Sequence, residues 1–366
     1  MIIEGFKGKL FSEFGGYYKV ESLRLYGIRD LRYEESPRPT IEQGDEVIIR
    51  VRNAGICGSD ISRYKKVGPL IPGNIWGHEY AGEVFEFGDN VTDLNVGDRV
   101  AVCPALYCGK CKYCRSGYIA ACPDLLVTGA KVPGGFATYV KVPRENVIRI
   151  PDSVSFEEAA FVEPSAVALH GIYKTNLQPG YSVAVMGCGT IGLLAIQWAK
   201  ICGAQVVYAI DIEDEKLDLA KQVGADIVIN PKDGNTHEQI MTYTNGNGVD
   251  LAVEAAGSPI TSSQIFALAK KGGEVVFMGI PYADVQIERF YFEKIVRQEL
   301  TVYGSWNAVS SPFPGREFHT TIHCMDVGKL QVKPLISHRV PLKMGPEMFE
   351  RIIDNKKVFT KVMFEL

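Results

Sequence analysis

The chain has no run of about 18 or more apolar residues, and this absence argues against a membrane-spanning helix. It also lacks a strong charge imbalance, because 39 Lys and Arg residues stand against 43 Asp and Glu residues and leave a net charge of −4. That balance gives no reason to expect nucleic acid or a membrane surface as a partner. No internal repeat or low-complexity segment is present. With 366 residues, of which 46% are hydrophobic and 22% charged, the sequence predicts a globular protein of two domains with a sizeable core.

The first 19 residues lack the apolar segment of a signal peptide, because charges interrupt them at Glu4, Lys7, Lys9 and Glu13. We interpret residues 1–19 as an N-terminal extension that is an extra strand, an arm, or a segment foreign to the native chain. Nine cysteines without an export signal predict a reducing cytoplasm and a role in metal binding.

Four of these cysteines follow the spacing C-x2-C-x2-C-x7-C within one short stretch, and they are Cys108, Cys111, Cys114 and Cys122. Random cysteines seldom fall at this spacing, and four thiolates hold a structural zinc ion in a closed tetrahedron. The alternatives are disulfides or unpaired buried thiols, but no secretory context supports them. Cys57 and His78 form a separate pair upstream, which is of the kind that holds a catalytic zinc with an open position. The sequence therefore predicts two zinc ions per chain.

Residues 20–150 read as short strands separated by glycine and proline. Residues 45–52 (DEVIIRVR), 81–87 (AGEVFEF) and 136–142 (FATYVKV) alternate apolar and polar side chains, as half-buried strands do. This part predicts a small all-β barrel or sandwich.

After residue 164 the pattern changes to alternating strands and helices. The expected strands are 181–186, 206–210, 251–254 and 274–278, and the expected helices are 191–201 and 214–223. This βαβ order predicts a doubly wound parallel sheet, so the fold class is α/β. Residues 310–366 are too few for a third domain, and we expect them to pack on the first one.

A glycine-rich motif joins the first of these strands to its helix and predicts a dinucleotide site. Its coenzyme-contacting residues are Gly187, Gly189, Thr190, Ile191 and Gly192. The glycines permit a tight turn and a close approach of the backbone to a pyrophosphate at the helix N-terminus. Alone, the motif is also compatible with an ordinary glycine turn. Asp211 ends the next strand, where it would accept hydrogen bonds from the adenosine ribose and repel a 2′-phosphate, so the predicted coenzyme is NAD.

Several motifs together resemble the zinc-dependent medium-chain alcohol dehydrogenases over nearly the whole chain from residue 20. They are GICGSD (55–60), GHEYAGEV (77–84), VGDRV (96–100), the cysteine stretch, GGFATY (134–139), EP (163–164) and the glycine motif. The resemblance implies a GroES-like zinc-binding catalytic domain at 20–165 and 310–366 and a Rossmann coenzyme domain at 166–309. It also implies coenzyme contacts at Gly279 and Ser305, and a homodimer or homotetramer.

Carried over by motif, the resemblance implies that Cys57 and His78 bind the catalytic zinc. Where many relatives have a second cysteine, this chain has Glu163, as in the sorbitol dehydrogenase branch, and a carboxylate makes a harder and weaker zinc site. Glu79 is expected to approach the metal during ligand exchange, and Asp60 to orient the imidazole of His78.

The implied activity is oxidation of a secondary alcohol on the zinc, with hydride transfer to the nicotinamide. Ser59 matches the position that contacts the substrate oxygen and begins proton release. Ser62 replaces the histidine that continues this relay in many relatives, so the proton is expected to leave through water or ribose hydroxyls. We expect His170, in an apolar helix-like segment, to serve packing instead.

Within the polyol branch, residues 189–197, 209–221 and above all 299–317 (ELTVYGSWN..SSP.PG.E) resemble dehydrogenases of sugar-alcohol phosphates such as galactitol 1-phosphate. The residues that could bind the phosphate are Arg63, Lys65, Lys131 and Arg316, and each could equally be a solvated surface residue. Two alternatives remain. One is an unphosphorylated polyol, diol or threonine as substrate, and the other is a non-catalytic or quinone-reductase-like protein.

Overall fold

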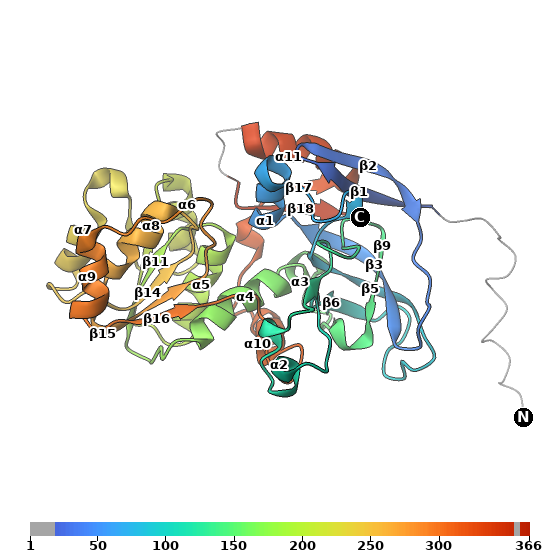
Figure 1. Ribbon diagram of the computed structural model, residues 1–366, viewed down its shortest axis with the longest axis horizontal. Helices are drawn as coiled ribbons and strands as arrows, with labels where there is room; N and C mark the ends of the chain where they lie inside the picture. The colour runs from blue at the N-terminus through green and yellow to red at the C-terminus, as the bar shows by residue number, and fades with distance from the viewer. Residues whose placement is uncertain (1–18, 355–358) are drawn as a thin grey trace, which may run out of the picture.

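The computed structural model describes residues 19–354 and 359–366. The expected extension at 1–19 lies outside the described residues except for Lys19, where the first strand begins. Two lobes lie side by side, with β11–β16 and their helices in one and the remaining strands in the other (Figure 1). No helix of the described ranges has both the length and the apolar character to cross a membrane.

The first lobe is built on a mixed seven-stranded sheet of order β10-β6-β5-β3-β18-β17, with β9 also paired to β3. Its central strand β3 is buried on both faces over most of its length because neighbouring elements cover both sides. A three-stranded sheet of order β2-β1-β4 and the short pair β7-β8 complete the lobe. The strands are β1 (Lys19–Gly27), β2 (Asp30–Pro37), β3 (Glu46–Gly55), β4 (Asn74–Ile75), β5 (Glu79–Phe87), β6 (Arg99–Val102), β7 (Ala105–Leu106), β8 (Leu126–Val127), β9 (Tyr139–Pro143), β10 (Val147–Arg149), β17 (Ile336–Pro341) and β18 (Lys361–Glu365).

The expected strand at 136–142 is wrong in its first half, because β9 begins only at Tyr139. Phe136 is fully buried and its N–H donates to the carbonyl of Trp76, while Ala137 forms an isolated bridge with Ser22. This segment therefore bonds to the loop before His78, and alternation alone could not distinguish such contacts from a strand.

The second lobe contains the predicted doubly wound sheet, which has six parallel strands in the order β13-β12-β11-β14-β15-β16. This is the order of a dinucleotide-binding fold, in which ligands bind beyond the carboxyl ends of the strands at the point where the strand order reverses. The strands are β11 (Ser182–Met186), β12 (Val206–Ile210), β13 (Ile227–Ile229), β14 (Val249–Glu254), β15 (Ala269–Phe277) and β16 (Thr301–Gly304). The helices are α4 (Val162–Tyr173), α5 (Thr190–Ile201), α6 (Asp214–Gln222), α7 (Thr236–Tyr243), α8 (Pro259–Gln264) and α9 (Arg289–Arg297).

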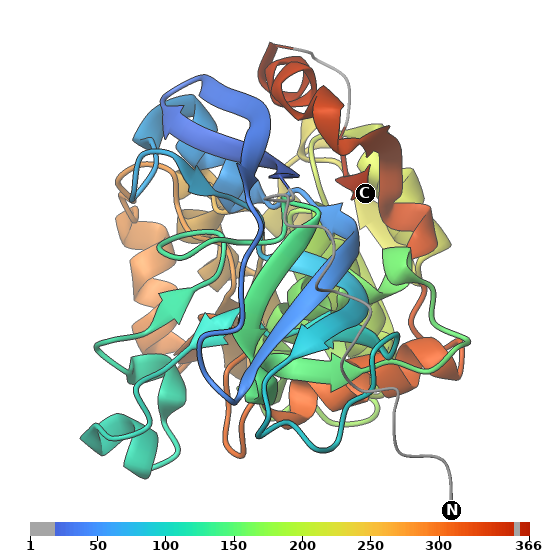
Figure 2. The same cartoon turned by 90° about the vertical axis from the view of Figure 1, so that its right-hand side faces the viewer.

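The C-terminal segment connects the two lobes. β18 pairs antiparallel with β3, with Met363 opposite Gly55, and α10 packs against α4. Figure 2 shows the red C-terminal strands and helices beside the blue N-terminal strands, although these segments are far apart in sequence. The helices of this lobe and of the connection are α1 (Gly58–Ser62), α2 (Lys112–Arg115), α3 (Phe156–Ala159), α10 (Arg316–Asp326) and α11 (Gly345–Asp354).

Candidate active site

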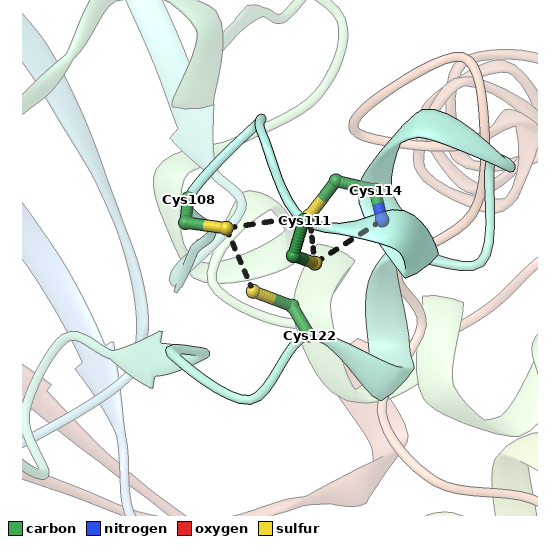
Figure 3. Close-up of side chains that lie close together, drawn as sticks. All are labelled: Cys108, Cys111, Cys114 and Cys122. Atoms are coloured by element: carbon green, nitrogen blue, oxygen red, sulfur yellow. Dashed lines mark hydrogen bonds between the residues drawn. The ribbon is translucent and has the colours of Figure 1, made fainter.

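The four clustered cysteines face one another around a common centre (Figure 3). The Sγ–Sγ distances are 3.4 Å for Cys111–Cys114, 3.6 Å for Cys108–Cys122 and 3.9 Å for Cys108–Cys114. Zn–S bonds of about 2.3 Å in a tetrahedron place the sulfurs about 3.8 Å apart, so the donor set fits zinc. All nine cysteines are free thiols, which argues against the disulfide alternative.

Backbone N–H groups form hydrogen bonds with the sulfur atoms of this cluster. Cys111 is the N-cap of α2, and its Sγ accepts a hydrogen bond from the N–H of Cys114 at 3.4 Å. Backbone N–H groups of Lys110 and Cys111 lower the pKa of Cys108 to about 7, because they donate to the thiolate form. The backbone therefore favours the thiolate form of Cys108, whereas burial and the neighbouring thiols raise the pKa of Cys114 to about 12.

A second group of possible metal ligands lies where β3 meets α1 and β5. One donor atom each of Cys57, His78 and Glu79 lies within 4.8 Å of the others. Asp60 Oδ2 accepts the N–H of Cys57 at 3.0 Å, and Asp60 Oδ1 lies 3.6 Å from Nδ1 of His78. Asp60 thus contacts the backbone of Cys57 with one oxygen and the imidazole of His78 with the other.

Electrostatics at this group favour a cation. Burial lowers the pKa of His78, but the carboxylate of Asp60 and the thiol of Cys57 raise it more strongly, and the result is well above the usual value. The same negative potential would favour a divalent metal ion, although the ammonium of Lys361 beside Glu79 opposes it.

Glu79 joins this group, whereas Glu163 does not belong to the set within 4.8 Å. Glu163 lies in the first turn of α4, and no described group donates a hydrogen bond to its carboxylate. Burial raises its pKa to about 7, although His78 opposes the shift. Glu163 therefore interacts electrostatically with His78, but no described residue donates a hydrogen bond to its carboxylate.

The sequence did not indicate that Glu79 has a partner of its own, Lys361, at the start of β18. Both side chains are buried, with Lys361 2% and Glu79 1% exposed, and Nζ lies 2.5 Å from Oε2 of Glu79. Nζ also donates to the carbonyl of Ile56 at 3.0 Å. Gly55 leaves room for this carboxylate, since a Cβ there would lie 2.5 Å from Oε2. A lysine within the apolar strand KVMFE was the only sequence signal for the pair.

Ser59 and Ser62 lie on α1 immediately after Cys57, and both are exposed. Ser59 is thus beside the metal-ligand group with its hydroxyl accessible. His170 differs from its expected role as a packing residue: it is buried, but its Nδ1 forms a 2.7 Å hydrogen bond with Oε1 of Glu317. Glu317 is 147 positions away, so no local pattern could reveal the pair.

The glycine motif has the geometry of a phosphate-binding turn. Gly187 has a φ of +96°, and a Cβ at Gly192 would lie 1.7 Å from the carbonyl oxygen of Gly187. A Cβ at Gly189 would meet nothing within 4 Å, so this N-cap of α5 faces open space. Thr190 is anchored by its Oγ1, which donates to the carbonyl of Thr360 at 2.8 Å. Ile191 occupies the same first turn.

Asp211 follows β12 and its carboxylate is fixed against the glycine turn. Oδ2 accepts the N–H of Cys188 at 2.7 Å, and Oδ1 accepts the N–H of Glu213 at 3.0 Å. At the carboxyl ends of β15 and β16 lie Gly279 and Ser305, and the buried Oγ of Ser305 has no hydrogen-bond partner among the described residues. An unpaired buried hydroxyl costs free energy unless a ligand bonds to it, so Ser305 fits a coenzyme contact.

Comparison with known proteins agrees with this geometry. Residues 43–152 match the alcohol dehydrogenase GroES-like domain, and residues 190–322 match the zinc-binding dehydrogenase domain. Sorbitol dehydrogenase of Bacillus subtilis is 36% identical over 344 residues, which cover 93% of this chain and 95% of that protein. Galactitol 1-phosphate 5-dehydrogenase of Escherichia coli is 38% identical over 309 residues, which cover 84% of this chain and 89% of that protein. The crystal structure of galactitol-1-phosphate dehydrogenase from Escherichia coli superposes with a TM-score of 0.90 at 35% identity, covering 94% of this chain and all of that one.

The chain belongs to the zinc-dependent medium-chain alcohol dehydrogenases, in the branch that contains the sorbitol and polyol dehydrogenases. The predicted fold class, a GroES-like domain with a Rossmann domain, is confirmed. The protein is an oxidoreductase that depends on zinc and a nicotinamide coenzyme.

Proposed function

We propose that the protein oxidises a secondary hydroxyl of a sugar-alcohol phosphate to a ketose phosphate and transfers the hydride to NAD. The observation that carries this proposal is the group of Cys57, His78 and Glu79, whose donor atoms lie within 4.8 Å of one another directly before the exposed Ser59. A catalytic zinc site has three protein ligands and an open position for the substrate.

We assign Cys57, His78 and Glu163 as the catalytic zinc ligands. Glu79 is already paired with Lys361, whereas Glu163 accepts no hydrogen bond from a described residue. Glu79 is the carboxylate that would exchange onto the metal, and Asp60 keeps the His78 ring in place. Zinc held there would act as a Lewis acid that lowers the pKa of the substrate alcohol. Cys108, Cys111, Cys114 and Cys122 would hold the structural zinc.

Proton release is assigned to Ser59. Its accessible hydroxyl accepts the proton of the substrate alcohol and passes it to solvent, because Ser62 supplies no imidazole for a longer relay. Thr190, Ile191 and the three motif glycines would hold the pyrophosphate and Asp211 the adenosine ribose. Gly279 and Ser305 lie at the strand ends where the nicotinamide is expected. We further infer a homodimer or homotetramer, since β16 is an edge strand with exposed residues such as Val302.

The substrate class is tested with a panel of polyols, each with and without a phosphate, by following NADH formation. Galactitol 1-phosphate should give a kcat/KM about ten- to hundred-fold above that of galactitol or sorbitol, the discrimination expected from one or two charge-assisted hydrogen bonds. Equal values would instead favour a dehydrogenase of free polyols, the second candidate, which the 36% identity to sorbitol dehydrogenase supports. No oxidation of any polyol, diol or threonine would refute both.

A further inference from the structure

A cavity of about 180 Å³ lies at the carboxyl end of β16, between the four-cysteine loop and α4. Its polar and aromatic walls come from Tyr118, His170, Lys174, Trp306 and Ser310. A single water needs only about 10–15 Å³ by the same kind of measure, so the cavity can hold a larger polar group. None of these residues belongs to the proposed metal or coenzyme sites.

His170 offers an unpaired ring nitrogen at this cavity. Its side chain is 10% exposed, and Nδ1 is occupied by Oε1 of Glu317 at 2.7 Å. The other oxygen of Glu317 accepts a hydrogen bond from Ser310 at 2.7 Å, so the carboxylate is held from two sides. Nε2 has no partner among the described residues, and His170 lines the cavity. A carboxylate on one ring nitrogen fixes the orientation of the ring and leaves the other nitrogen for a ligand.

Lys174 supplies a positive charge without a carboxylate partner in the described part of the chain. Its Nζ lies 5.7 Å from the ring centroid of Tyr118, so an aromatic face holds the cation at the cavity wall. Nearby, the guanidinium of Arg316 lies 4.1 Å above the ring of Tyr173, the residue before Lys174. An aromatic ring attracts a cation but carries no net charge, so Lys174 and Arg316 keep their positive charge.

The helix α4 carries a residue of the proposed zinc site and a residue of the cavity, and the spacing between them suits an extended substrate. Glu163 and His170 are seven residues apart on α4, which places them on nearly the same helix face with a rise of about 10.5 Å. In a six-carbon polyol, six bonds separate C5 from the phosphorus on C1, and about 1.25 Å of advance per bond gives about 7.5 Å. The phosphoryl oxygens and one hydrogen bond to the protein account for the difference between this length of about 7.5 Å and the helix rise of about 10.5 Å.

The segment that resembles polyol-phosphate dehydrogenases surrounds the same cavity. Residues 299–317 contribute Trp306 and Ser310 to its wall, and they contribute Glu317 to the hydrogen bond with His170. Arg316, a phosphate candidate from the sequence, lies over the ring of Tyr173, which precedes the cavity residue Lys174. Of the others, Arg63 donates a hydrogen bond to the carbonyl of Gly68.

We propose that this cavity binds the phosphate group of the substrate, with Lys174 and His170 as its direct ligands and Glu317 as the residue that positions His170. The inference rests on the proposed oxidation of a sugar-alcohol phosphate. Lys174 donates from Nζ to a phosphoryl oxygen. His170, when protonated, donates from Nε2 to a second oxygen while Nδ1 donates to Glu317.

Binding can be measured without turnover because Trp306 reports on the cavity. It is 53% exposed, whereas the other two tryptophans, Trp76 and Trp198, are 2% and 0% exposed. Galactitol 1-phosphate should change the fluorescence saturably, galactitol should not, and Trp306→Phe should abolish the signal. Lys174→Met should weaken the apparent affinity about tenfold or more, as loss of a charge-assisted hydrogen bond does.

Kinetics supply the second measurement. Lys174→Met should lower the ratio of kcat/KM for galactitol 1-phosphate to that for galactitol by about ten- to hundred-fold. Lys271→Met, which removes the same charge at the amino end of β15, is the matched control and should leave the ratio unchanged. Inactivity of the wild type on every polyol would refute the proposed function, whereas the fluorescence titration decides the subsite separately. Saturation by inorganic phosphate with no preference for the phosphorylated polyol, or an unchanged ratio in Lys174→Met, would overturn the subsite.

Discussion

Lys361→Met should destabilise the protein strongly, because it leaves the carboxylate of Glu79 buried without its cation. Both side chains are at most 2% exposed, and the Nζ–Oε2 distance is 2.5 Å. Removing one partner of such a pair costs about 3–5 kcal/mol, whereas an exposed pair contributes at most about 1 kcal/mol. Methionine keeps the length and volume of the side chain, so the charge accounts for most of the difference. The loss also includes the hydrogen bond from Nζ to the carbonyl of Ile56.

The assay is urea unfolding of the zinc-loaded protein, with zinc content measured for each variant. Lys361→Met should lower the free energy of unfolding by about 3 kcal/mol or more, and the Glu79→Gln/Lys361→Met double variant should regain part of that loss, because no unpaired charge remains. The exposed control Lys271→Met should change it by about 0.5 kcal/mol or less. A loss below about 1 kcal/mol for Lys361→Met, or no recovery in the double variant, would refute this account of the pair.

Three further predictions address the metal sites, the coenzyme and acid stability. Cys57→Ala should abolish turnover and lower the zinc content by one ion, with little change in the unfolding midpoint. Cys111→Ser should lose the other zinc ion and unfold at a clearly lower temperature, since structural zinc contributes folding energy. Normal activity in Cys57→Ala would contradict the assignment. Asp211→Ser should reduce the ratio of kcat/KM for NAD to kcat/KM for NADP about ten- to hundred-fold, mainly by raising KM for NAD. Asp211→Asn is the control that removes the charge but keeps the shape of the side chain. Burial raises the pKa of Glu317, but hydrogen bonds from His170 and Ser310 lower it below its usual 4.5 overall. The stabilisation of the folded protein by the Glu317 carboxylate is therefore full above pH 4.5 and is lost as the pH falls through the folded pKa. The difference in unfolding temperature between the wild type and Glu317→Gln should accordingly shrink on acidification, and an increase would contradict this account.

Features with a local physical cause could be predicted from the sequence. The strand at 181–186 and the helix at 191–201 correspond to β11 and α5 within one residue, because a buried parallel strand and an apolar helix each have a distinct pattern. The clustering of the four cysteines could likewise be predicted, since they lie within 14 positions of one another.

Features that depend on distant partners could not be predicted. Lys361 and Glu79 are 282 positions apart, and His170 and Glu317 are 147 apart. A charged residue in an apolar segment shows only that a partner must exist, because an unpaired buried charge is costly. The partner itself is set by how β18 returns to β3 and how α10 packs on α4.

The helix α4 links the two ends of the proposed substrate site. Glu163 in its first turn interacts electrostatically with His78, and His170 two turns later lines the cavity. Gly171 lets the helix approach the end of β15, since a Cβ there would lie 2.2 Å from Cε of Met278. Seven residues of a rigid helix place the backbones of Glu163 and His170 about 10.5 Å apart along its axis. This spacing would select substrates by the number of carbons between the oxidised hydroxyl and the phosphate, as well as by charge.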